Sequence, residues 1–201
     1  LYCPHLLAGS RCGNSVVNAV SIMRKPDDLR TPVLDIIPMR RKHLKAIMPI
    51  EEVVYPRPWT LGVFHAEIEL VRREQRFYIV GQIGEEVVGY GGLLFTPDDA
   101  HVTNIAVHPE WQRRGIATDL LLELAWKARE RECQALTLEV RMSNTPAQEL
   151  YRRFGFVPAG VRKKYYENVE DAMVMWCHEV SSFEYGARLR EIEMERANAH
   201  R

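Results

Sequence analysis

The most constraining feature of the sequence is a short basic turn, Gln112-Arg113-Arg114-Gly115-Ile116-Ala117-Thr118. It follows a strand-like run that ends at Val107 and precedes a helix predicted over 116–130. The first turn of a helix carries about four unpaired N–H groups and a partial positive charge, which together bind phosphate. Gly115 lets the backbone approach an anion closely, and the two arginines add charge. The turn predicts a phosphate-binding site; an ordinary strand-to-helix connection with solvated arginines is the alternative.

Apolar periodicity predicts strands and helices on both sides of this turn. The predicted strands are Val33–Pro38, Arg76–Gln82, Val87–Phe95, His101–Val107, Ala135–Val140 and about Asp171–Val180. The predicted helices have apolar stripes that run through Leu44–Val54, Phe64–Val71, Ile116–Ala128 and Ala147–Phe154. Turn residues between the second, third and fourth strands predict a meander of antiparallel neighbours. The order β-α-α-β-β-β-α-β-α-β predicts an α+β layer structure.

Polar residues mark where two of the helices begin. Thr60 has the residue type and position of an N-cap. Thr145-Pro146-Ala147-Gln148 has the form of a capping box, with threonine as the cap, proline next and glutamine three residues on. Because Thr145 can fill the cap, we expect the amide of Asn144 to be left for a ligand.

The length of 201 residues suits one well-buried domain. We expect residues 1–30 to be an N-terminal extension, 31–181 to form the domain, and 182–201 to be a charged helical tail. In that tail Tyr185, Leu189 and Ile192 have helical spacing. A solvated helix is favoured there over a helix that docks a partner.

Charge and cysteine usage exclude several classes of protein. The 27 Lys+Arg balance 27 Asp+Glu, which argues against a broad surface for nucleic acid or membrane. No apolar stretch approaches the roughly 20 residues of a membrane span, and the start lacks a signal-peptide pattern. The four cysteines form no zinc pattern, so no metal is expected, and Cys133 and Cys177 are expected to be buried thiols. We expect a cytoplasmic protein that binds neither nucleic acid nor membrane directly.

The motif Gln112-x-x-Gly115-x-Ala117, set between a strand meander and a second strand-helix pair, resembles the pyrophosphate loop of GNAT acetyltransferases. The resemblance implies the GNAT fold, a central mixed, mostly antiparallel, splayed sheet flanked by helices. It implies acetyl-CoA as co-substrate, with the turn on the diphosphate and the preceding strand on the pantetheine arm. The cofactor-binding residues that it implies are Ile105, Ala106, Val107, Gln112, Arg113, Arg114, Gly115, Ile116, Ala117, Thr118 and Asn144.

Further motifs narrow the resemblance to the RimI-type ribosomal-protein-alanine N-acetyltransferases. These motifs are Leu138-Glu139-Val140-Arg141-x-Ser143-Asn144, Leu150-Tyr151-x-x-Phe154-Gly155-Phe156, Arg162-x-x-Tyr165-Tyr166, and Pro58-Trp59-Thr60 with Phe64. The likeness covers roughly Val33 to Val180. It implies that the acceptor is the N-terminal alanine of a small-subunit ribosomal protein.

Amide formation from a thioester needs one group that accepts a proton from the amine and one that protonates the departing thiolate. Glu139 is the candidate base; an exposed acid on a strand is the alternative, although glutamate disfavours strands. In the resembled family this glutamate accepts the proton, directly or through water. Tyr151 is the candidate acid, because a phenol with a pKa of about 10 stays protonated at neutral pH. Its position on an apolar stripe also fits a buried aromatic.

Trp59, Tyr165 and Tyr166 are the candidate acceptor-binding residues, since aromatic rings and hydroxyl donors line peptide clefts. Core packing or a rim contact is the alternative for each. Two other functions share parts of this pattern. One is acetylation of a small amine or a lysine side chain, and the other is a non-catalytic acyl-CoA-binding module. The acceptor region, Tyr55–Phe64 and Val161–Glu167, discriminates between the enzyme functions.

Overall fold

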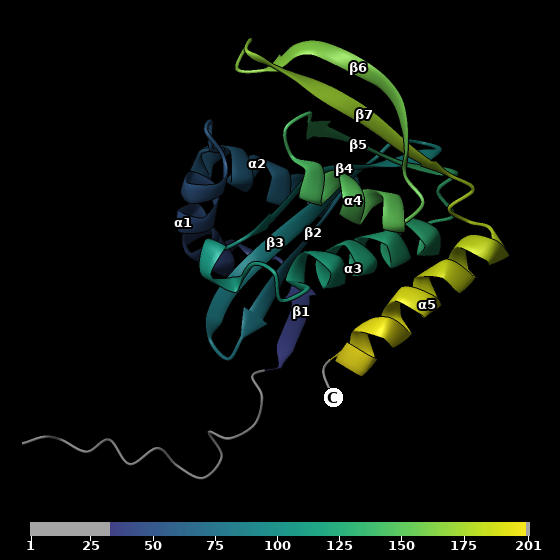
Figure 1. The fold of residues 1–201 in the computed structure, drawn as a ribbon. Coiled ribbons are helices and arrows are strands. Elements are labelled where there is room, and N and C mark those ends of the chain that lie inside the picture. Colours follow the sequence, from purple (N-terminus) through teal and green to yellow (C-terminus); the bar gives the residue numbers. More distant parts are fainter. Residues whose placement is uncertain (1–32, 200–201) are drawn as a thin grey trace, which may run out of the picture. The chain divides into compact units, whose positions relative to one another are not determined.

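The computed structural model describes residues 33–199, so the N-terminal extension expected at 1–30 lies outside the described residues. Within that range, seven strands form one sheet in the order β1-β2-β3-β4-β5-β7-β6 (Figure 1). The strands are β1 (Leu34–Pro38), β2 (Arg76–Ile83), β3 (Glu86–Phe95), β4 (Asp99–Val107), β5 (Ala135–Arg141), β6 (Val157–Tyr166) and β7 (Glu170–His178). The helices are α1 (Leu44–Val54), α2 (Leu61–Val71), α3 (Ile116–Glu130), α4 (Thr145–Arg153) and α5 (Phe183–Ala199), with 3-10 turns η2 (Arg41–His43) and η3 (Pro109–Trp111).

The sheet is mixed and mostly antiparallel, as the sequence predicts. Strands β1 to β4 form an antiparallel meander, and β5, β7 and β6 are antiparallel to one another. The two groups are joined by a parallel pairing of β4 with β5 that covers Asp99–His101 against Ala135–Thr137. Beyond His101 the two strands separate. The α+β fold with a splayed sheet is therefore confirmed.

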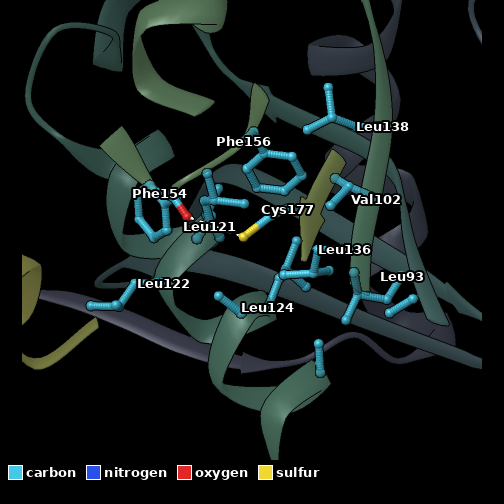
Figure 2. Packing of buried hydrophobic residues seen from close by; sticks show 14 of the residues in the cluster. Leu93, Val102, Leu121, Leu122, Leu124, Leu136, Leu138, Phe154, Phe156 and Cys177 are labelled. Carbon is cyan, nitrogen blue, oxygen red and sulfur yellow. Dashed lines mark hydrogen bonds between the residues drawn. The ribbon is translucent and has the colours of Figure 1, made fainter. Parts of the chain in front are cut away.

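Helices cover both faces of the sheet, and each face has its own hydrophobic core. Alternate residues of β2 divide between them, since Tyr78 and Val80 face α1 and α2, whereas Ile79 faces α3. Figure 2 shows the larger core, in which Leu121 and Leu124 of α3 pack with side chains from the sheet. Cys133 and Cys177 are buried free thiols, as expected.

Strand β6 was not predicted from the apolar pattern, which indicated no element between Gly155 and about Asp171. Almost every β6 side chain is exposed, so the strand has no buried alternation to reveal it. Pro158 and Gly160 flank an irregularity in its register, as befits an edge strand. Its pairing with β7 holds it in the sheet, and this long-range contact is invisible to local sequence patterns.

The C-terminal segment forms a helix, as expected, but the expectation that this helix is solvated was wrong. Tyr185, Leu189 and Ile192 of α5 are buried in the same core as α3. Burying one such side chain contributes roughly 1.5–3 kcal/mol. The guanidinium of Arg129 on α3 adds hydrogen bonds to the carbonyls of Val180 and Ser182. The stripe therefore packs α5 alongside α3 (Figure 1).

Candidate active site

A cleft of about 360 Å³ opens where β4 and β5 separate. Val102–Ile105 of β4 and Leu138–Arg141 of β5 form two of its walls. Helix α1 with the segment that follows it, α4, and the end of β6 form the others. Seven of the predicted site residues line this cleft: Trp59, Ile105, Glu139, Asn144, Tyr151, Tyr165 and Tyr166.

Glu139 lies at the point of separation and is held there by two cationic or polar partners. Its Oε2 lies 3.1 Å from Nε2 of His101, and its Oε1 lies 3.1 Å from Nη2 of Arg162. The side chain is 9% exposed. The hydrogen bond from His101 lowers the pKa of Glu139, although burial opposes this shift. Glu139 is thus an ionised carboxylate at neutral pH.

His101 was not predicted as a site residue, and the structure brings it to Glu139 through the sheet. The parallel register places His101 opposite Thr137, whose Oγ1 lies 2.8 Å from Nδ1 of the imidazole. Glu139 follows Thr137 by two residues and points to the same side. No short motif links the two strands, so the sequence contained no local signal for this pair.

Tyr151 enters the cleft from α4. Its ring packs against Phe156 with the centroids 5.8 Å apart. Burial raises the pKa of Tyr151 to about 12. The phenol therefore remains protonated over the whole neutral range, which suits a hydrogen-bond donor or a proton donor.

A second carboxylate, that of Glu51, lines the cleft from α1 and was also missed as a site residue. It is 2% exposed, accepts a hydrogen bond of 2.7 Å from the backbone N–H of Trp59, and accepts another from the hydroxyl of Tyr90. Burial raises its pKa. The sequence feature that could have indicated Glu51 is its position as a charged residue on the apolar stripe of the first predicted helix. Glu51 holds the Trp59 segment against the cleft.

Tyr55 occupies the edge of β4 that the resemblance assigns to the pantetheine arm. Its hydroxyl donates to the carbonyl oxygen of Ile105 at 3.1 Å. The carbonyl of Val107 similarly accepts from the side-chain amide of Gln112 at 3.0 Å. The side chains of Ala106 and Val107 are buried, so these residues present only main-chain groups to a ligand.

The β6–β7 hairpin closes one side of the cleft. The hydroxyl of Tyr166 donates to the carbonyl of Glu139 at 3.1 Å, and its ring meets that of Tyr165 edge to face, with centroids 5.1 Å apart. Arg141 stacks over Tyr166 at 4.1 Å and pairs with Glu167 at 2.8 Å and Glu170 at 3.0 Å. The ion pairs of Arg141 therefore fix the aromatic end of the hairpin.

Asn144 caps α4, and the prediction that Thr145 does so was wrong. The Oδ1 atom of Asn144 accepts from the backbone N–H of Ala147 at 3.2 Å. Gln148 does not complete a capping box, because its buried amide donates to the carbonyls of Arg141 and Met142 instead. Asn144 directly precedes the first helical residue, Thr145. From this N-cap position its short side chain can accept from the free N–H of Ala147 in the first turn. Asn144 still lines the cleft.

The basic turn stands at the start of α3, as predicted. Gly115 is the N-cap with φ +84°, and no side chain caps the first N–H groups of the helix. Arg113 also has positive φ, at 62°. Arg114 lies over the ring of Trp111 at 4.6 Å, so its guanidinium is turned along the loop. The side chains of Ile116 and Thr118 are buried. The hydrogen-bond donors that this turn can offer a ligand at these positions are therefore its backbone N–H groups.

Comparison of the sequence with known proteins shows which family the chain belongs to. The model of the acetyltransferase (GNAT) family matches residues 44–156. The chain belongs to the GNAT acetyltransferase family. It is therefore an acyltransferase that uses acetyl-CoA.

Two relatives and one crystal structure show how far the GNAT likeness extends. The ribosomal protein bS18-alanine N-acetyltransferase of Escherichia coli K12 is 42% identical over 137 residues, which cover 66% of this chain and 88% of that protein. An N-alpha-acetyltransferase of Sulfurisphaera tokodaii is 32% identical over 143 residues, 64% of this chain and 83% of that protein. The crystal structure of the ribosomal-protein-S18-alanine N-acetyltransferase from Escherichia coli matches with a TM-score of 0.67 and 29% identity, covering 73% of this chain and 94% of that chain.

Among residues 33–199, no group of three or more His, Cys, Asp or Glu side chains is arranged to hold a metal ion. In the same part of the chain, no helix has the length and apolar character needed to traverse a bilayer.

Proposed function

We propose that the protein transfers the acetyl group of acetyl-CoA to the N-terminal α-amino group of a protein, namely the N-terminal alanine of a small-subunit ribosomal protein. The observation that carries this proposal is the cleft at the separation of β4 and β5, which brings Glu139 and Tyr151 together beside an aromatic hairpin. The choice of acceptor follows the Escherichia coli relatives, which are named as acetyltransferases of the alanine of ribosomal protein S18. We propose the cytoplasm as its location, since ribosomal proteins are made there.

The donor set of this chain fits acetyl-CoA. The uncapped backbone N–H groups at the start of α3, with Arg113 and Arg114 nearby, suit a diphosphate. The edge of β4 beyond His101 no longer pairs with β5, so its main-chain groups at Asn104–Val107 can bind amides of the pantetheine arm. The amide nitrogen of Asn144 remains a donor toward the cleft, since the cap uses only its oxygen. When bound, acetyl-CoA supplies an activated acetyl group as a thioester.

In this proposal Glu139 serves as proton acceptor. A peptide α-amino group has a pKa of about 7.7–8.0, so an appreciable fraction is already neutral near neutral pH. A carboxylate with a lowered pKa is too weak a base to deprotonate the free ammonium efficiently. The nitrogen becomes far more acidic once its bond to the acetyl carbon forms, and Glu139 then accepts its proton, directly or through water.

Tyr151 serves as proton donor to the departing sulfur. As the new C–N bond forms, the C–S bond breaks and the thiolate needs a proton. The buried phenol holds its proton at neutral pH and lies across the cleft from β5. Proton acceptance at Glu139 and donation at Tyr151 balance the reaction.

The acceptor side of the cleft suits a peptide end. Trp59, fixed through its N–H to Glu51, and the Tyr165–Tyr166 pair offer aromatic surface and hydroxyl groups. The carboxylate of Glu139, whose pKa is lowered, attracts a positively charged amino terminus.

The test is incubation with acetyl-CoA and hexapeptides that differ only at residue one, followed by mass measurement. We expect a gain of one acetyl group on the α-amine, fastest for the alanine-starting peptide. An α-amine-blocked peptide with an internal lysine is the control and should remain unmodified. Equal modification of the lysine or of free small amines would contradict the proposal and favour the second enzyme function. Tight acetyl-CoA binding without any transfer would favour the non-catalytic module.

A further inference from the structure

The C-terminal helix contacts the basic turn through Arg196. The Nε and Nη2 atoms of Arg196 donate to the two carboxylate oxygens of Asp119, at 2.6 and 2.7 Å. Asp119 lies in the first turn of α3. Both side chains are mostly buried, at 15% and 17% exposed. A two-pronged arginine–carboxylate pair of this kind fixes the relative position of two elements.

Arg196 also contacts the backbone of the turn itself. Its Nη2 donates to the carbonyl oxygen of Arg114 at 3.1 Å. A Cβ atom added to Gly115 would overlap the guanidinium of Arg196. The guanidinium therefore lies against Gly115, and a side chain at this position would have to displace it. Glycine suits this position because of its φ of +84°, and its lack of a side chain leaves room for the guanidinium.

The charge of Asp119 makes this contact relevant to a phosphate ligand. The backbone N–H of Asp119 donates to the carbonyl of Gly115 at 3.0 Å, so the residue directly follows the uncapped donors of the first turn. A bare carboxylate at that position competes with a diphosphate for the positive end of the helix and repels it. Arg196 supplies the opposite charge at hydrogen-bonding distance. Helix α5 lies outside residues 44–156, which the family model matches.

We propose that Arg196 is a positioning residue of the acetyl-CoA site, which holds the diphosphate-binding turn in shape and neutralises Asp119. This inference rests on the proposed binding of the diphosphate by the turn at 112–118. Arg196 acts through Asp119, Arg114 and Gly115, and its effect is expected on the affinity for the phosphate-bearing donor rather than on the chemical step. Helix α5 thereby becomes part of the enzyme's donor site.

The test compares two thioesters, acetyl-CoA and S-acetylpantetheine, of which the second has no diphosphate. In Arg196→Gln, which retains most of the side-chain stem, the KM for acetyl-CoA should rise about tenfold, while kcat and the KM for S-acetylpantetheine stay near wild type. Arg196→Lys keeps the charge and should recover part of the loss. Arg190→Gln, an exposed arginine on the same helix, is the matched control and should match wild type.

The double variant Arg196→Gln/Asp119→Asn separates charge from packing. Removing the acid should return the KM for acetyl-CoA most of the way to wild type, whereas a purely structural role predicts further loss. The inference is overturned if Arg196→Gln leaves the KM for acetyl-CoA unchanged, if both thioesters lose equally, or if the double variant is no better than the single one. If the wild type itself uses both thioesters equally well, the diphosphate is not bound, and the proposed donor site fails first.

Discussion

His101, which ends the pairing of β4 with β5, contacts Glu139, two residues beyond its partner Thr137, with Nε2 of the imidazole 3.1 Å from Oε2 of the carboxylate. One residue further along β4 the strands have begun to separate and the cleft opens. The contact thus joins the closed part of the sheet to its open part. It keeps an ionised carboxylate at the mouth of the split, lining the cleft.

Replacing Glu139 by glutamine tests the proposed base. We expect Glu139→Gln to lower kcat by about 10²-fold, since a positioned proton acceptor contributes at least that much. The KM for acetyl-CoA should change little, because the proposed diphosphate site is at α3. Steady-state kinetics with an alanine-starting peptide measures both constants. Glu149→Gln, an exposed acid on α4, is the control. Wild-type turnover in Glu139→Gln would remove this residue from the mechanism.

Removing His101 should change the ionisation of Glu139. The hydrogen bond from His101 is the largest cause of the lowered pKa, and burial acts against it, so the pKa of Glu139 should rise in His101→Ala. A carboxyl whose pKa is lowered by folding adds stability above its ordinary value of 4.5, and this is lost as the pH falls through the folded pKa. Carboxyl carbon NMR titration should show a wild-type midpoint below 4.5 that moves upward in the variant. A wild-type midpoint at or above that value would show that the contact is not formed in solution.

The phenol of Tyr151 can be removed without removing its ring. Tyr151→Phe keeps the packing against Phe156, so the fold should be retained. We expect kcat to fall by roughly 10- to 10²-fold, because the thiolate loses its proton donor. With its pKa raised to about 12, Tyr151 should cause no loss of activity in the alkaline direction up to about pH 9. Tyr185→Phe alters a buried phenol outside the cleft and serves as the comparison. Equal rates for both variants would exclude Tyr151 as the acid.

Arg141 should affect the acceptor but not the donor. Arg141→Ala removes the ion pairs to Glu167 and Glu170 and the cover over Tyr166, which frees the hairpin end. The KM for the peptide should rise about tenfold because the acceptor wall must be ordered on binding, while the KM for acetyl-CoA stays constant. Lys163→Ala breaks an exposed ion pair of the same hairpin and should have little effect. A rise in the acetyl-CoA constant alone would contradict this role.

Glu51 should affect the pH dependence of the free energy of unfolding rather than the rate of acetyl transfer. Its raised pKa means that the folded state binds more protons than the unfolded state above 4.5, so this residue lowers the free energy of unfolding as the pH rises. Glu51→Gln removes that dependence and keeps an acceptor for the N–H of Trp59. The stability of the variant relative to wild type should therefore increase as the pH rises above 4.5 and through the raised pKa of the folded state. Urea unfolding across this range measures it, and a constant difference would contradict the burial argument.

Much of the local structure was predictable from the sequence. The helix at 116–130 was predicted to its end residues, because its apolar stripe and the glycine before it are local signals. Thr60 caps its helix as predicted, since the side chain accepts from Val63 three residues on. Local spacing failed where two residues compete for one role, as Asn144 and Thr145 do at the start of α4.

Whether a site residue could be predicted depended on how far along the chain its interaction partner lies. Glu139 and Tyr151 were predicted from the resemblance to the GNAT family, which short motifs carry, and both residues line the cleft. His101 and Arg196 were missed because each matters through a residue on another element, Glu139 for the one and Asp119 for the other. Such pairs are set by strand register and helix docking, which leave no trace in nearby residues.

By itself the sequence determined the order of the elements other than β6 and the glycine turn before α3, because each depends on hydrogen bonds and side-chain periodicity over a few positions. The candidate site residues came from the resemblance to the GNAT family. Tertiary structure alone decided that β6 joins the sheet, that α5 packs beside α3, and that β4 and β5 separate just beyond His101. The reason is that burial and pairing energies between distant segments depend on the three-dimensional register. The cleft belongs to this second group, since it exists only where that pairing stops.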